Sequence, residues 1–306
     1  MTIQTAPWRA LFLAAAICSV PALAQDTAEA EPEMSAEQQA YMEEARALWE
    51  SLTPRTGEIT LPGGFATLNV PESYYYLNAA DTATVLEDVW GNPPGGTTLG
   101  MLMPEKYTPF DSDSWAVTIE YVEDGYVSDA DAHEINYDKL LKQMQKETRA
   151  ASKQRDAAGY GTVELLGWAE SPYYSSTDKH MYWAKELVFN DEDKVLNYDI
   201  RTLGRKGVLS MTFIAATEQL SEINTARDEI LAMAAFNDGF RYEDYNPDTD
   251  KLAAYGLGAL VAGAVAKKTG LLVAALVFLK KFGVFILVGI AALFGKIKGM
   301  FTGNKA

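Results

Sequence analysis

The chain has 306 residues, of which 48% are hydrophobic and 22% charged. This composition is typical of a core-forming globular protein and excludes a disordered or collagen-like chain. The formal net charge of −16 argues against a nucleic-acid partner, because an acidic protein has no general attraction to phosphates. The charge is unevenly spread: residues 25–250 carry −25, whereas residues 1–24 and 251–306 contain no acidic residue.

Residues 1–24 are predicted to be a secretory signal peptide. Arg9 precedes an apolar run, Pro21 ends it, and Ala22-Leu23-Ala24 has the small-x-small pattern of a cleavage site. The alternative, an uncleaved anchor, is disfavoured because the apolar run is short for a membrane span. Cys18 is the only cysteine, so cleavage leaves a mature chain without thiol chemistry. Lipidation of Cys18 is a weaker alternative, because the residue before it is bulky.

Residues 251–306 are predicted to form a hydrophobic, Lys-flanked membrane anchor. Four lysines are the only charges between residues 252 and 294, and we expect residues 252–295 to contact the lipid bilayer. One full span would place the basic C-terminal end in the cytoplasm, and a hairpin is the open alternative. The expected location is therefore the cell membrane, with the acidic domain facing the periplasm or the exterior.

The middle of the chain is predicted to be one soluble α+β domain, residues 35–250, preceded by a flexible acidic leader at 25–34. Ser35 starts a helix that is expected to pack on the body of the domain. A hairpin follows around the turn Pro62-Gly63-Gly64, and Asp81 is expected to cap a short helix.

Strand signals dominate the second half of this domain. Alternating apolar residues predict a strand at Trp115–Tyr121, and Asn136 starts a helix that ends near Gly159. Four segments separated by short turns are predicted to be antiparallel strands: 162–168, 180–189, 195–203 and 207–216. A helix is predicted to follow them at 218–235. The expected fold class is α+β, with an antiparallel sheet of about five to seven strands and covering helices.

Several runs of residues resemble the domain of unknown function 2167 family. They include Trp90-Gly91-Asn92-Pro93-Pro94, Asp113-Ser114-Trp115-Ala116-Val117, Tyr182-Trp183-Ala184-Lys185-Glu186-Leu187 and Leu196-Asn197-Tyr198-Asp199-Ile200-Arg201. The resemblance extends over roughly residues 40 to 300 in one order. It implies an exported, membrane-attached bacterial protein, and it supplies no catalytic residue.

The candidate catalytic residues lie on two predicted strands. The sequence contains no nucleophile elbow, Walker loop or zinc-protease motif. Asp199 and Arg201 share one face of their strand and, if paired with Glu186 on the neighbouring strand, would form a polar cluster suited to acid/base or anion-binding chemistry. His180 would be a further candidate. A solvated sheet face with cross-strand ion pairs is the favoured explanation.

A divalent cation is conceivable at the acidic stretch that contains Asp129, Asp131, His133 and Glu134. The stretch lacks the glycine of a calcium-binding loop at its required place, so a solvated loop is favoured and no metal or other cofactor is expected.

The aromatic residues leave two further possibilities open. Tyr74-Tyr75-Tyr76 and Tyr173-Tyr174 could line a sugar-binding groove, but core packing and contacts with a partner explain them more simply. Alternation along a strand predicts that one of three consecutive tyrosines points outward. The expected function is a membrane-anchored, extracytoplasmic, non-catalytic binding module, with another membrane or envelope protein as a candidate partner. The alternative is an envelope hydrolase that uses the carboxylates on the sheet face.

Overall fold

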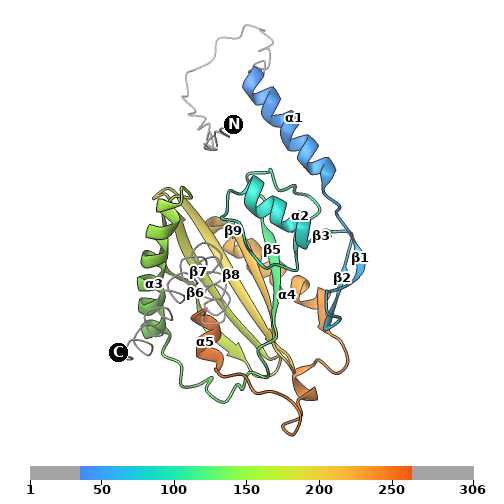
Figure 1. Ribbon diagram of the computed structural model, residues 1–306, viewed down its shortest axis with the longest axis vertical. Coiled ribbons are helices and arrows are strands. Elements are labelled where there is room, and N and C mark those ends of the chain that lie inside the picture. Colours follow the sequence, from blue (N-terminus) through green and yellow to red (C-terminus); the bar gives the residue numbers. More distant parts are fainter. Residues whose placement is uncertain (1–34, 264–306) are drawn as a thin grey trace, which may run out of the picture.

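The computed structural model describes residues 35–263, so the predicted signal peptide, the acidic leader and residues 264–306 lie outside the described part. A seven-stranded sheet with the order β3-β4-β5-β9-β8-β7-β6 forms the body of the domain (Figure 1). Its strands are β3 (Tyr74–Asn78), β4 (Gly100–Pro104), β5 (Ala116–Val122), β6 (Val163–Ser175), β7 (His180–Phe189), β8 (Asp193–Leu203) and β9 (Val208–Ala216). All neighbouring strands are antiparallel, which confirms the predicted α+β class.

A second, three-stranded sheet contains the predicted hairpin. Its order is β1-β2-β10, with strands β1 (Gly57–Thr60), β2 (Ala66–Val70) and β10 (Ala234–Phe236). The turn places Gly63 and Gly64 at φ 91° and 68°, in the left-handed region where glycine has no steric penalty.

The described helices are α1 (Ala36–Ser51), α2 (Ala79–Thr84), which continues into the π-helical turn η1 (Val85–Val89), α3 (Tyr137–Ala157), α4 (Leu220–Met233) and α5 (Leu257–Val261), with 3-10 turns η2 (Thr217–Gln219) and η3 (Tyr242–Asp244). The helices α1 to α4 fall where the sequence pattern predicts them, whereas α5 lies in the segment that was predicted to be a membrane anchor. Asn136 caps α3 as expected, its side chain accepting a hydrogen bond from the Lys139 amide. The cap of α2 is Asn78 rather than Asp81.

One face of the large sheet is apolar and packs against α4 and the small sheet. We call it the apolar face. Its strands contribute the buried side chains Leu196, Tyr198, Ile200, Met211 and Phe213. α4 adds Ile223 and Ile230, so this layer forms the main hydrophobic core.

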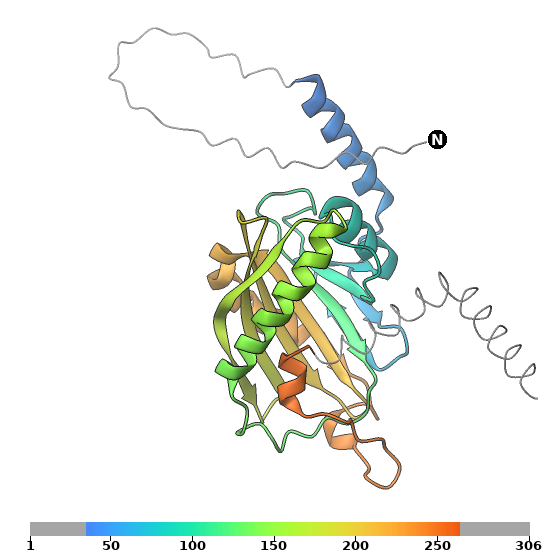
Figure 2. The same cartoon turned by 60° about the vertical axis from the view of Figure 1, so that its left-hand side comes forward.

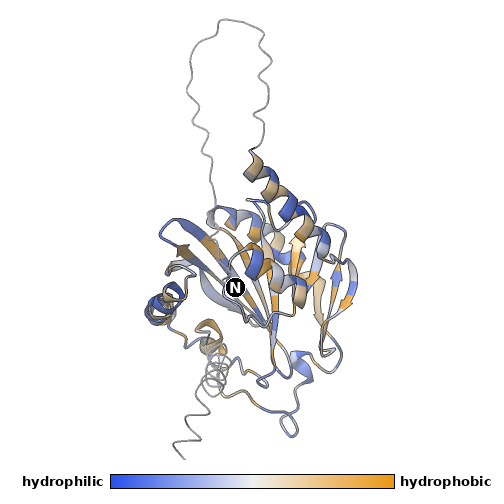
Figure 3. Cartoon of the chain, turned by 45° about the horizontal axis from the view of Figure 1, so that its top comes forward, coloured by the Kyte–Doolittle hydropathy of each residue, from blue (hydrophilic) through white to orange (hydrophobic). Residues whose placement is uncertain are grey.

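The opposite face is covered in parts, and we call it the polar face. α2 packs over the β3–β4 end, whereas α3 and α5 lie over β6 and β7 (Figures 1 and 2). The strands alternate between hydrophilic and hydrophobic residues, as Figure 3 shows. Between the part covered by α2 and the part covered by α3 and α5, this face contains buried polar side chains, among them Thr118, Asp199 and Ser210.

Two local expectations are wrong. Only the C-terminal end of α1 packs on the body, through a contact of Trp49 with Tyr75 at a ring distance of 5.6 Å and through Leu52, the residue directly after the helix. Met42, nearer the start of the helix, is 57% exposed, and α1 projects from the domain (Figure 1). Tyr74, Tyr75 and Tyr76 are all buried, because β3 is covered on both of its faces.

The folded domain extends beyond residue 250, into the predicted anchor. Ala253, Leu257 and Val261 are buried against the body. The Tyr126 amide donates to the Lys251 carbonyl at 2.9 Å, and the Ala253 amide donates to the Tyr126 carbonyl at 2.8 Å. Residues 251–263 therefore belong to the domain. Within residues 35–263, no helix combines the length and apolarity that crossing a bilayer requires.

Candidate functional site

A buried carboxylate occupies the middle of the polar face. Asp199 is 1% exposed, and the pairing of β8 places it opposite Thr212 on β9 and Trp183 on β7. Its Oδ1 accepts hydrogen bonds of 2.9 Å from both Arg201 Nη2 and Thr212 Oγ1. Its Oδ2 forms an ion pair with Lys185 Nζ at 2.8 Å. Two cations and one hydroxyl thus converge on a single carboxylate.

The electrostatics of this cluster depend on burial. Burial alone would raise the pKa of Asp199, but the positive charges of Lys185 and Arg201 more than offset it and hold the pKa below its ordinary value. The nearby Glu120 shows the opposite balance: burial raises its pKa, Arg201 opposes this, and repulsion from Asp199 adds to the increase. Asp199 is therefore ionised at neutral pH, whereas Glu120 binds a proton more readily than usual.

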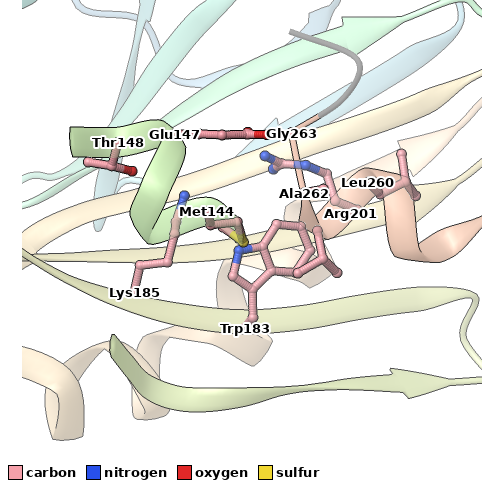
Figure 4. A pocket seen from close by; sticks show the side chains of 10 residues that line it. Met144, Glu147, Thr148, Trp183, Lys185, Arg201, Leu260, Ala262 and Gly263 are labelled. Atoms are coloured by element: carbon pink, nitrogen blue, oxygen red, sulfur yellow. The ribbon is translucent and has the colours of Figure 1, made fainter. Parts of the chain in front are cut away.

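A solvent-reachable hollow of about 180 Å³ lies beside the cluster. Met144, Glu147 and Thr148 of α3 form one wall, and residues 260–263 form another. Trp183, Lys185 and Arg201 rise from the sheet and complete the lining (Figure 4). The guanidinium of Arg201 lies 5.1 Å from the centre of the Trp183 ring, a cation–π contact that fixes both side chains.

The structure brings together two of the four predicted catalytic candidates. Asp199 and Arg201 are in contact, as expected. Glu186 lies on the apolar side of β7 and pairs with Lys194 at 3.3 Å. His180 lies on that side too, where its Nδ1 is 2.9 Å from the hydroxyl of Tyr182, and burial lowers its pKa. The expected grouping of Glu186 with Asp199 is therefore wrong.

Register explains this error. Residues directly opposite each other in a sheet share a face, and Glu186 pairs with Leu196, whereas Asp199 pairs with Trp183. The side chain that meets Asp199 is consequently Lys185, which the sequence reasoning missed. The available signal was that Lys185 lies between Trp183 and Leu187 on its face of the strand. A lysine among apolar neighbours needs a carboxylate partner if it is withdrawn from water.

The acidic stretch does not gather its side chains around one point. Asp129 accepts hydrogen bonds from the Tyr174 hydroxyl at 2.8 Å and from Lys179 at 2.9 Å. Asp131 accepts one from the Leu257 amide, whereas His133 and Glu134 are exposed. In the described ranges, no three His, Cys, Asp or Glu side chains are placed to hold a metal ion.

An aromatic and arginine cluster lies at the edge of the apolar face, and the sequence reasoning missed its central cation. Tyr173, which is 39% exposed, stacks on Tyr182 with ring centres 4.7 Å apart. Arg227 Nη1 donates to the hydroxyls of Tyr198 at 2.9 Å and Tyr173 at 3.2 Å. Tyr173 is therefore the exposed member of a cluster whose other members, Tyr182, Tyr198 and Arg227, are buried or partly buried.

Comparisons with known proteins identify the family. The chain is similar to two solved structures: PsbP (CyanoP) of the cyanobacterium Synechocystis sp. PCC 6803, and the Ran-binding protein Mog1p of Saccharomyces cerevisiae. The first has a TM-score of 0.32 and 11% identity over 61% of this chain and 93% of that one. The second has a TM-score of 0.31 and 11% identity over 61% and 96%. No curated protein sequence matches the chain. The profile of the family described as protein of unknown function (DUF2167) matches residues 53–291, and the chain therefore belongs to this family.

Proposed function

We propose that the protein is a membrane-anchored, extracytoplasmic binding module that does not catalyse a reaction. The observation that carries this proposal is the hollow beside Asp199, where Lys185 and Arg201 present cationic groups within a preformed cavity. Preformed cavities with a few convergent polar groups are typical ligand sites.

The state of Asp199 supports binding rather than catalysis. A general base needs an oxygen within reach of the substrate proton. Both oxygens of Asp199 are instead engaged inside the protein, by Arg201, Thr212 and Lys185. The hydrolase alternative would use Glu186 or Asp199 together with His180. The strand register places Asp199 on the opposite face of the sheet from His180, so these two side chains cannot act together.

Membrane attachment is supported by the sequence after the described domain. Residues 264–306 contain seven lysines and no acidic residue, and the remainder is mostly apolar. The preceding helix α5 packs on the polar face, against Met181 and Trp183. On this proposal the hollow lies close to the membrane, because Ala262 and Gly263 line it directly before the anchor.

Protease treatment of spheroplasts tests the topology. A tag placed after Ala306 should survive while the acidic domain is digested, because a single span leaves the C-terminal end in the cytoplasm. Loss of the tag together with the domain would support the hairpin. Survival of both would contradict an extracytoplasmic domain.

Purification from native membranes tests the binding role. The full chain is extracted in mild detergent, and bound proteins and small molecules are identified by mass spectrometry. We expect a protein or small molecule to copurify in a stoichiometric amount and to be chemically unchanged. Conversion of the recovered small molecule by the purified protein would contradict the non-catalytic proposal.

A further inference from the structure

The hollow on the polar face contains hydrogen-bond donors that the described protein leaves without acceptors. Lys185 has one acceptor, Asp199, among residues 35–263, so two of its three N–H groups remain available. Arg201 uses its two terminal nitrogens on Asp199, Thr212 and the Ile200 carbonyl, and its Nε has no acceptor in the same range.

Trp183 supplies a second, independent observation. Its side chain is 1% exposed and lines the hollow, and its indole N–H has no hydrogen-bond partner within the described part of the chain. Figure 4 shows the indole nitrogen turned toward α3, on the side of Met144. A buried donor without an acceptor costs free energy, so such a group needs an explanation. A ligand in the hollow that carries a hydrogen-bond acceptor would satisfy this N–H group.

The positive groups of the hollow lie on one side of it, and the preference for an acidic occupant comes from this arrangement rather than from the net charge of the lining. Lys185 and Arg201 bring two positive charges, and the buried Asp199 offsets one of them. Glu120 lies near Arg201, but burial raises its pKa. Glu147 stands on the opposite wall, where its carboxylate already accepts a hydrogen bond from Gln143 at 3.1 Å. The donors therefore gather on the sheet side, and an acidic group should sit there.

The hollow is large enough for a small acidic group. Its volume of about 180 Å³ is several times the roughly 30 Å³ that one water molecule occupies in the liquid. A phosphate or carboxylate group therefore fits this space, and the rest of a larger ligand can extend outward because the hollow opens to solvent. The apolar side chains of Leu260 and Val261 at the rim suit a short hydrocarbon substituent.

We propose that this hollow binds a small oxyanion, a phosphate or carboxylate group, through Lys185, Arg201 and the indole N–H of Trp183. The inference deepens the proposed binding function by naming the class of its ligand. Such a group can belong to a soluble metabolite or to the headgroup of an anionic lipid, and both present the same charged oxygens.

The indole resonance of Trp183 reports binding directly. Spectra of the full chain, labelled with ¹⁵N-tryptophan in maltoside micelles, are recorded as inorganic phosphate or acetate is added, and Trp183→Phe assigns the signal. We expect a saturable shift of this resonance, because a new acceptor changes the environment of its N–H. A second sample in nanodiscs that contain phosphatidylglycerol, without added phosphate, identifies a lipid as the source if the shift is present there.

Three variants separate a binding site from a structural cluster. Lys185→Gln should weaken phosphate binding about tenfold, because a charged hydrogen bond is lost. Lys185→Arg should restore it, because the positive charge and donor groups are kept. Lys194→Gln, on the opposite side of the sheet, is the matched control and should change nothing.

The inference is overturned if the Trp183 resonance shows no saturable shift with phosphate, acetate or phosphatidylglycerol. It is also overturned if folded Lys185→Gln, verified by an unchanged spectrum of the other tryptophans, binds as tightly as the natural chain. Protease accessibility and recovery from membranes test the proposed anchored binding role separately, so the two failures remain distinguishable.

Discussion

The two faces of the large sheet are built from the same strands and yet differ in chemistry. On β8, Leu196, Tyr198 and Ile200 point into the main core, whereas Asp199 and Arg201 point to the other side. The apolar face is sealed by α4 and the small sheet. The polar face is covered only in parts and contains the hollow. On the proposed function, stability and recognition are divided between the two faces of one sheet.

This division follows from the two-residue period of a strand. Burial of apolar side chains on one face provides most of the favourable free energy of folding, at about 25 cal/mol for each Å² of apolar surface. The other face can then contain a buried ion-pair cluster. Compared with apolar side chains of the same volume such a cluster adds little or no stability, but it fixes the position of charged groups, and removing one of its members is costly.

The largest expected effect is on the apolar face. Phe213 is fully buried in the main core. Its replacement by alanine should lower the free energy of unfolding by about 3–5 kcal/mol, because a cavity forms. Urea denaturation measures this cost. Ser210→Ala, on the polar face of the same strand, is the control and should cost less than about 1 kcal/mol. Equal costs would contradict the division between the faces.

Asp199→Asn should destabilise by about 2–3 kcal/mol at neutral pH, because Lys185 and Arg201 then lose their carboxylate. The folded-state pKa of Asp199 is lowered, so its charge stabilises the fold at neutral pH. This contribution disappears as the pH falls below about 4 and through the folded-state value. Urea denaturation across pH should therefore show the two proteins converging in acid. A difference that persists unchanged at low pH would indicate a packing effect instead.

Glu120→Gln should have a smaller effect of opposite sign. Burial raises the pKa of Glu120, so its ionised form is disfavoured in the folded state, and stability falls as the pH rises above the ordinary value of 4.5. The variant should therefore be more stable than the natural chain at neutral pH and equal to it in acid. Thermal melts at both pH values measure the difference. A destabilised variant at neutral pH would show that Glu120 works as a needed partner of Arg201.

The smallest effect is expected at the exposed ion pair of Lys194 with Glu186. The lysine side chain is 55% exposed, so Lys194→Gln should change the unfolding free energy by less than about 1 kcal/mol. Added salt should reduce even that difference. A larger cost in urea denaturation would mean that this pair, rather than the Asp199 cluster, is the important charge contact of β7.

The sequence was most informative where periodicity is strong. The strands that contain residues 180–216 and the following helix were predicted within a few residues, because alternation and turn signals agree there. β4 was missed, since its residues, Gly100–Pro104, are all buried and show no alternation. Glu186 was grouped with Asp199 because the face that a residue takes depends on strand register, which a single sequence does not reveal.

The end of the domain was misplaced for a related reason. Leu257, Leu260 and Val261 have the apolarity of a membrane segment, and only their packing against the body shows that they belong to the domain. Apolar side chains suit a protein core and a lipid core equally well. The hollow was also beyond sequence reasoning, because it combines residues from α3, two strands and α5.

The most direct test of the account compares the reactivity of two lysines on β7 and β8 in native membranes. Lys185 faces the proposed ligand site, whereas Lys194 lies outside it and is paired with Glu186. Acylation of both is followed by mass spectrometry with and without added phosphate. We predict that phosphate slows the modification of Lys185 and leaves that of Lys194 unchanged. Equal behaviour of the two lysines would contradict the assignment of the polar face as the binding face.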